Sequence, residues 1–264
     1  GVIPGDGDTN IGYGIAVDPS TNAAVIVGET NSTAGLPTGI AGFRKTPNAR
    51  QAAPGTNSED AADGFAARVS ANGGALEYFT LLTGVNDYDA TKPFNADRAF
   101  GVTLLADGSA LIAGETSATK FPANDQGAQI ANTQANTAGG MDGFVVRLTA
   151  DGTNVSFAKT LGATGYDSAE AVAGMTDGYV ALFNRSASGA PQTPTLAEGL
   201  LQSPAGGQDG YLVKYASATG AVTYSGFLGS SSDEAFYALD YSNVAGTAGH
   251  PERTTSMSVG GVTT

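Results

Sequence analysis

Apolar residues along this chain form short runs separated by polar turns, and the runs recur in a fixed order. Three runs follow an Asp-Gly-aromatic sequence and begin at Asp63, Asp142 and Asp209. A further run comes about ten residues after each and ends in leucine, at Leu82, Leu161 and Leu228. These runs are rich in β-branched and aromatic residues, which predicts β-strands. The chain shows no convincing 3.6-residue spacing of apolar positions, the pattern of an amphipathic helix.

Each copy also has two earlier runs. They lie at 14–18 and 23–30, at 101–105 and 110–116, and at 171–174 and 179–184, and a fourth copy begins at 235–240. Turn signals separate the runs, at Asn72-Gly73, Asp107-Gly108, Asp151-Gly152 and Asp177-Gly178. Such pairs favour hairpins because glycine accepts a positive φ. Four strands per copy, with copies roughly 70 to 80 residues apart, predict a repeat larger than most solenoid units and long enough for a propeller blade. We expect the leucines that end the fourth strands to be buried between neighbouring sheets, together with the equivalent second-strand residues Val27, Ile112 and Leu182.

The recurring frame is Gly-Ile-Ala-Val-Asp, Val-x-Gly-x-Thr, Asp-Gly-Phe-Val-x-Arg/Lys-Leu and aromatic-x-x-x-Leu-Gly. It resembles the SBBP family of bacterial and archaeal propeller repeats, whose members are usually seven-bladed. The resemblance implies an all-β propeller of four-stranded antiparallel blades, with about three and a half blades present. It implies no particular activity, because the family is named for its repeat.

The predicted units are three full repeats and a partial one. They are 1–84 with a long loop at 33–62, 85–163 with a loop at 120–141, 164–230 with a loop at 186–208, and 231–264. The loops separate the second and third strands of each unit and contain most of the prolines. Because blades repeat radially, we expect the loops to emerge on equivalent faces, where they can contact a partner or be tolerated surface decoration.

Composition narrows the setting. A chain of 264 residues can bury roughly 70–75% of its unfolded surface when compact. The net charge of −13 argues against binding to nucleic acid or to anionic membranes. The absence of cysteine excludes disulfides and thiolate metal sites, and the longest apolar stretches are too short for a membrane helix. The acidic, lysine-poor, glycine-rich composition predicts a secreted or cell-surface protein. Because the sequence starts at Gly1 without an initiating methionine or a signal peptide, we expect it to be processed or excised from a longer precursor.

Candidate catalytic groups are few. His250 is the only histidine and lies in a turn-like Gly-His-Pro-Glu sequence, so a Ser-His-Asp triad would depend on it. Glu29 and Glu115 are the obvious carboxylate pair for a glycosidase. They occupy matching repeat positions, and Asn184 replaces them in the third copy. Recurrence at one position indicates a structural role at a strand end, and we expect no enzymatic activity.

The sharpest local motif is Asp6-Gly7-Asp8-Thr9-Asn10, which resembles the opening of a calcium loop. Asp6, Asp8 and Asn10 are the candidate ligands, although Ile11 replaces the expected glycine and the bidentate glutamate is missing. Acidic residues recur at equivalent places in later copies, and the alternative interpretation is that they bond turn amides. They are Asp87 and Asp89, Asp167, and Asp233 with Glu234. The Asp-Gly-aromatic anchors have the same two readings, with an Asx-turn favoured. Three sequons mark candidate glycosylation sites, at Asn31, Asn154 and Asn184.

The sequence therefore predicts an extracellular or cell-surface structural and interaction module that binds a protein partner or itself. The alternative is a carbohydrate-binding or polysaccharide-active propeller that uses loop carboxylates. An exposed cleft of acids and aromatics would favour carbohydrate, whereas uniform burial would favour a scaffold. The aromatics that decide this are Tyr13, Tyr88, Tyr166 and Tyr237.

The partial fourth unit predicts open ends. An arc of three and a half blades exposes two apolar faces, which soluble monomers rarely leave uncovered. We expect these ends to be covered by more of a longer protein, or by another subunit in an oligomer, surface filament or S-layer. The tail 251–264 is a candidate strand for that closure.

Overall fold

The computed structural model describes residues 10–30, 62–84, 96–118, 121, 140–162, 165–175, 177–186, 206–244 and 254–263. Sheet 1 contains β1 (Asn10–Val17), β2 (Ala24–Thr30), β3 (Asp63–Val69) and β4 (Leu76–Leu82). Sheet 2 contains β5 (Asp97–Leu104), β6 (Ala110–Thr116), β7 (Asp142–Leu148) and β8 (Val155–Leu161). Sheet 3 contains β9 (Ser168–Gly174), β10 (Gly178–Ser186), β11 (Gln208–Ala216) and β12 (Val222–Leu228). Sheet 4 contains β13 (Glu234–Val244) and β14 (Thr254–Thr263).

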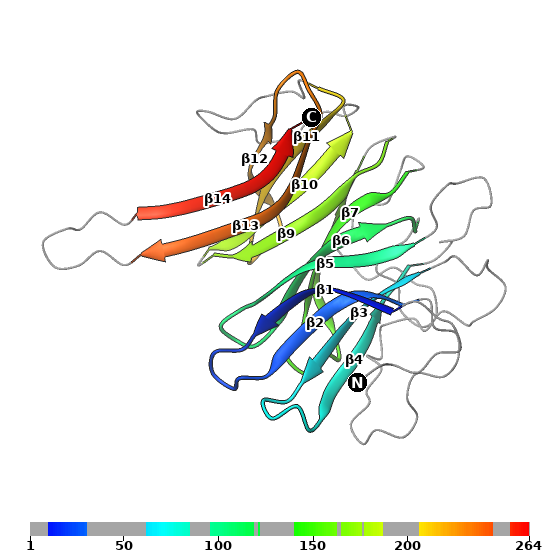
Figure 1. The fold of residues 1–264 in the computed structure, drawn as a ribbon. Helices are drawn as coiled ribbons and strands as arrows, with labels where there is room; N and C mark the ends of the chain where they lie inside the picture. The colour runs from blue at the N-terminus through cyan, green and yellow to red at the C-terminus, as the bar shows by residue number, and fades with distance from the viewer. Residues whose placement is uncertain are drawn as a thin grey trace, which may run out of the picture.

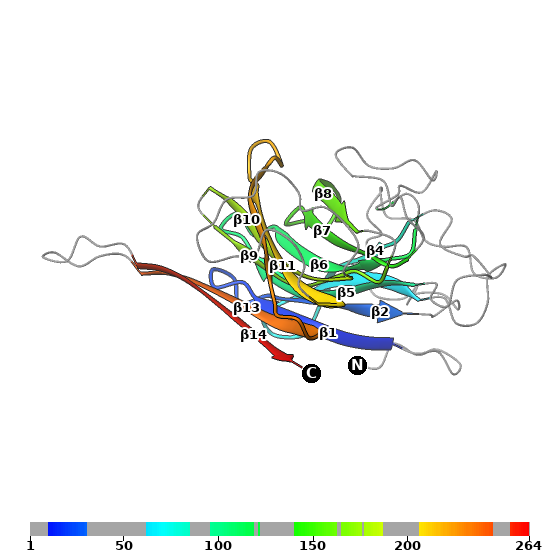
Figure 2. The ribbon, with the colours of Figure 1, turned by 90° about the horizontal axis from the view of Figure 1, so that it is seen from above.

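The chain is thus all-β, with three four-stranded antiparallel sheets and a two-stranded one, as the repeat pattern predicts. Each four-stranded sheet is a meander in which strands adjacent in sequence are adjacent in space. The sheets pack against one another in chain order, and the first strands β1, β5, β9 and β13 follow one another through the middle of the molecule (Figure 1, Figure 2). The described ranges contain no helix with the length and hydrophobicity needed to span a bilayer.

The core lies between successive sheets. One cluster joins sheets 1 and 2, a second joins sheets 2 and 3, and a third joins sheets 3 and 4. The leucines that end the fourth strands occupy these clusters as predicted: Leu82 and Leu161 are buried, whereas Leu228 is only partly buried. The second-strand residues predicted to share this core, Val27, Ile112 and Leu182, are also fully buried.

Strand register corrects one predicted equivalence. Val27 pairs with Gly14, and Leu182 pairs with Ala171, at the same point of their sheets. The residue at that point in sheet 2 is Ala113, so Ile112 is offset by one position. Because successive strand residues point to opposite faces, Ile112 faces sheet 1, whereas Leu182 faces sheet 4.

The predicted glycine turns are mostly confirmed. Gly73, Gly108 and Gly152 have positive φ values of 68°, 77° and 69°. Gly178 does not, because it opens β10 and pairs with Ala216.

Candidate functional site

A cluster of ion pairs and tyrosines joins the first strands. Arg98 on β5 donates from Nε to Glu29 Oε2 at 2.6 Å and from Nη1 to Glu115 Oε1 at 2.7 Å. The Tyr13 hydroxyl donates to Glu29 Oε1 at 2.8 Å, and the Tyr166 hydroxyl donates to Glu115 Oε2. We call these five residues the Tyr–Glu–Arg cluster. One guanidinium ion therefore bridges glutamates from two sheets, and each glutamate also binds a tyrosine.

The surroundings raise the pKa values of Glu115, Tyr13 and Tyr166 in the cluster. Burial raises the pKa of Glu115, although Tyr166 and Arg98 bond its charged form. Burial, and then the hydrogen bond and charge of Glu29, raise the pKa of Tyr13 to about 12. The pKa of Tyr166 is raised in the same way, by burial and then by Glu115. Both phenols are therefore protonated donors at neutral pH, which fixes their bonds to the glutamates.

β-Bulges place one side chain of each first strand out of register. They fall at equivalent points of all four sheets, and the extra residues are Tyr13, Phe100, Glu170 and Tyr237. A bulge re-aims the side chain it carries. Tyr13 is 43% exposed and Tyr237 is 61% exposed, and the Tyr13 ring meets the Phe100 ring edge-on at 5.3 Å.

The tyrosines therefore do not share the uniform burial expected of a pure scaffold. Tyr13, Tyr237 and the 38%-exposed Tyr166 all reach the surface, and two of them bond carboxylates. Tyr88 lies outside the described residues. An aromatic and acidic surface of this kind can stack on a sugar ring or contact a cation.

The glutamates also have a clear structural task. Glu29 and Glu115 occupy the same position of β2 and β6, and Asn184 occupies it in β10. Asn184 bonds both the backbone N–H and the carbonyl of Phe236 on β13. The position thus links each sheet to the segment that begins the next, as the strand-end interpretation predicts. All four carboxylate oxygens of Glu29 and Glu115 accept hydrogen bonds from protein donors.

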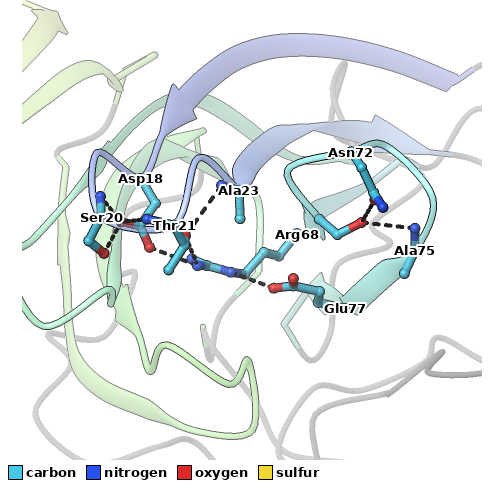
Figure 3. A network of polar contacts seen from close by, with 9 residues as sticks. Asp18, Ser20, Thr21, Ala23, Arg68, Asn72, Ala75 and Glu77 are labelled. Atoms are coloured by element: carbon cyan, nitrogen blue, oxygen red, sulfur yellow. Dashed lines mark hydrogen bonds and ion pairs between the residues drawn. The ribbon is translucent and has the colours of Figure 1, made fainter.

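A second recurring network lies at the turn after each first strand. Asp18 accepts bonds from the Ser20 backbone and hydroxyl and from Arg68 Nη2 at 2.7 Å, and Arg68 also reaches Glu77 (Figure 3). An equivalent ion pair recurs between Asp107 and Arg147 and between Asp177 and Lys214. The cation that follows each Asp-Gly-aromatic anchor thus pairs with an acid in the turn after the first strand. The bonds from Ser20, and then the one from Arg68, lower the pKa of Asp18.

Acids at the mouths of the first strands bind turn amides. Asp97 accepts a backbone bond from Gly84 at 3.0 Å, and Glu234 accepts one from Ser230 at 2.9 Å. Asp233 accepts two more, from Gly207 and Gln208. Of the acids predicted to recur at this place, Asp233 and Glu234 agree with the turn-bonding alternative, whereas Asp167 Oδ1 lies 3.6 Å from Arg185 Nε.

Several predicted site residues lie outside the described ranges, namely Asp6, Asp8, Asn31, Asp87, Asp89 and His250. Asn10 accepts a bond from the Thr30 hydroxyl at 2.5 Å. Within the described ranges, no three acidic or histidine side chains are grouped so that they can hold a metal ion. Of the two described sequon residues, Asn154 is exposed beside a turn, whereas Asn184 is buried and bonded to Phe236.

The candidate closing strand at the end of the chain is also located. Residues 254–263 form β14, which pairs with β13 of the same chain.

No family model matches this chain, and no curated protein is significantly similar to it.

Sequence reasoning missed Arg98 and the partners of Tyr166. Arg98 has no counterpart in the other copies, where Ile11 and Ser168 hold its register position. Its role becomes visible only when two sheets are brought together. The signal that was available is that Glu29 and Glu115 recur without a cation in their own strands.

Proposed function

We propose that the chain is a propeller-type repeat module that serves as an extracellular or cell-surface scaffold for protein–protein interaction. The observation that carries the proposal is an exposed apolar strip along β1, on the face of sheet 1 that has no described sheet packed on it. Phe65, Phe79 and Leu81 on the inner strands of the same face are buried, so the exposed part is the strip itself. Ile15 on this face is 64% exposed, and Val17 is 57% exposed. Their neighbours on the sheet are hydrophobic, and Ile15 pairs with the partly buried Ile26.

The equivalents of Ile15 show what such a position does when a sheet covers it. Val102, Val172 and Leu239 follow the bulge at the same register point. Each packs in a cluster between its own sheet and the preceding one. Ile15 therefore belongs to an interface type that the chain forms three times internally.

The opposite end of the stack supports the same proposal. Val262 on β14 holds the register position of Glu29, Glu115 and Asn184, each of which bonds to the segment that follows. Val262 is 54% exposed. Two complementary ends of this kind suit head-to-tail contact with a protein partner or a second copy, which yields a ring or a filament according to the rotation.

Light scattering tests this function. We expect concentration-dependent association, strengthened by salt because salt screens the repulsion between chains of charge −13. Ile15→Lys should weaken it, whereas Ala71→Lys, at an exposed turn position, should not. A wild-type chain that stays monomeric at high concentration and high salt would contradict the proposal.

A second candidate function is carbohydrate binding, favoured by the exposed Tyr13 and Tyr166 beside their carboxylates. Neutral oligosaccharides titrated into the protein by calorimetry test it. Tyr13→Ala and Tyr166→Ala should weaken binding. Tyr237→Ala is the matched control, since Tyr237 is exposed at the same bulge of a different sheet. Heat signals unchanged by the first two variants would exclude the cluster as the site.

A further inference from the structure

Among the described residues, sheet 4 contains counterparts of the first two strands of the repeat alone. β13 and β14 match the first and second strands of the other sheets, with the bulge at the same point. Even the strand-end bond is kept, since Thr263 donates to Glu234 as Thr30 does to Asn10. In sheets 1 to 3 the second strand is interior and pairs with a third strand on its other side. Among the described strands, β14 pairs with β13 alone.

An edge of this length is a template for strand pairing. β14 runs from Thr254 to Thr263, and the side chains described along it, from Ser258 onward, are exposed except for the half-buried Val259. Alternate backbone N–H and C=O groups of an edge strand point away from its only partner.

Sheets 1 and 2 show where a third and a fourth strand of sheet 4 would lie. In sheet 1 the aromatic that begins β4's buried stretch, Tyr78, is covered by the β7–β8 turn of sheet 2. A Cβ on Gly152 in that turn would lie 2.4 Å from the Tyr78 ring. In sheet 2, Phe157 is covered in the same way by the β11–β12 turn, where a Cβ on Gly220 would lie 3.0 Å from its ring.

The third aromatic of this series is left half-covered. Tyr224 on β12 is only partly buried, and so is Leu228 at the end of the same strand. Their equivalents in sheets 1 and 2 are buried, Tyr78 and Leu82 almost completely. Among the described residues, the partly exposed strip on sheet 3 and the edge of β14 without a described partner thus lie where a third and a fourth strand of sheet 4 would sit.

We propose that β14 and the Tyr224–Leu228 strip form a docking site for a β-hairpin of the repeat's own type. The proposal rests on the proposed function as an interaction module and names its partner. The first strand of the incoming hairpin carries Asp-Gly-aromatic and pairs with β14. A glycine turn follows, covers Tyr224, and returns as a strand over Leu228. Main-chain bonds to β14 supply affinity, and the aromatic and the turn supply specificity.

One glycine of β14 holds a position that is also glycine in sheets 1 and 2. Gly261 corresponds to Gly28 of β2 and to Gly114 of β6. In those strands the ring of Phe65 or Phe144 from the third strand lies against the glycine, within 2.9 Å and 2.5 Å of a built Cβ. At Gly261 the ring of Phe236 already lies 2.8 Å from the position of an added Cβ, so the aromatic of an incoming strand would pack against Phe236.

A fusion tests the proposal in cis. The hairpin sequence of residues 142–161 is appended after Thr264 through a flexible glycine-serine linker, which gives it a high effective concentration. We expect hydrogen exchange of the β14 edge amides to slow by roughly tenfold. A control fusion with Phe144→Ala in the appended copy should protect them less. Unchanged β14 exchange in the first fusion would overturn the proposal.

The same hairpin as a free peptide tests the mode of docking. Two N-methylated versions, modified at alternate residues of the first strand, block one backbone edge each. If the peptide pairs with β14, only one of the two versions should fail to protect the β14 amides from hydrogen exchange. Tyr224→Ala in the protein should weaken binding of the unmodified peptide. Equal behaviour of both versions would exclude strand pairing. The two proposals can fail separately, because Ile15 lies on sheet 1 and the hairpin site lies on sheets 3 and 4. Self-association that is weakened by Ile15→Lys, together with no hairpin docking, would support the proposed function and overturn the docking site.

Discussion

At the scale of single residues, position in the repeat decides what a charge does. Asp18, Asp107 and Asp177 hold the same turn position and each pairs with the cation of the third strand. Only the Asp18–Arg68 pair is shielded from water by its sheet, whereas the Asp177 carboxylate is well exposed. Removing one partner of a shielded ion pair destabilises the fold strongly, because the other charge stays buried without compensation, whereas removing one partner of an exposed pair has little effect.

Asp18→Asn should therefore destabilise the fold at pH 7 more than Asp177→Asn does. The folded pKa of Asp18 lies below its unfolded value near 3.9, so its stabilisation is complete above that value and is lost as pH falls through the folded pKa. Urea unfolding at pH 7 and pH 3 measures this. The difference in the free energy of unfolding between wild type and Asp18→Asn should be smaller at pH 3 than at pH 7. An equal difference at both pH values would show that the charge of Asp18 is not the cause.

At the scale of elements, most of the fold was predictable. The four-strand units, the Asp-Gly-aromatic strands and three of four glycine turns follow from local periodicity and turn chemistry. The one-residue offset of Ile112 was not predictable, because the bulge that sets the register leaves no mark in the apolar pattern. The bridge from Arg98 to Glu29 depends on how two sheets meet, and a repeat comparison finds only what recurs.

The turn glycines offer a matched pair for testing packing between elements. Gly73 and Gly152 hold the same turn position with nearly equal φ, but a Cβ on Gly73 meets nothing within 4 Å. Gly73→Ala should cost about 1–2 kcal/mol for the left-handed backbone alone. Gly152→Ala should cost a further ~1–3 kcal/mol, because its Cβ overlaps the Tyr78 ring. Chemical denaturation of both variants decides, and equal losses would mean that the turn does not press on Tyr78.

At the scale of the whole molecule, stability comes from one type of sheet-to-sheet interface used three times. Successive sheets bury their facing side chains, and the first strand of each sheet contacts the first strand of the next. The third interface is the smallest, because only two strands of sheet 4 face sheet 3. The outer strands of sheet 3 therefore contribute less buried surface than their equivalents.

The terminal leucines of the fourth strands measure this gradient directly. Leu82→Ala and Leu161→Ala should each cost about 2–5 kcal/mol, the range for emptying a well-packed site. Leu228→Ala should cost less, because the side chain is already partly in water and its loss leaves a smaller cavity. Urea unfolding of the three variants under one set of conditions makes the comparison. In the hairpin fusion the cost of Leu228→Ala should rise toward the other two, because the added strands would cover it. A Leu228→Ala cost equal to that of Leu82→Ala in the unfused chain would show that sheet 4 already closes the interface.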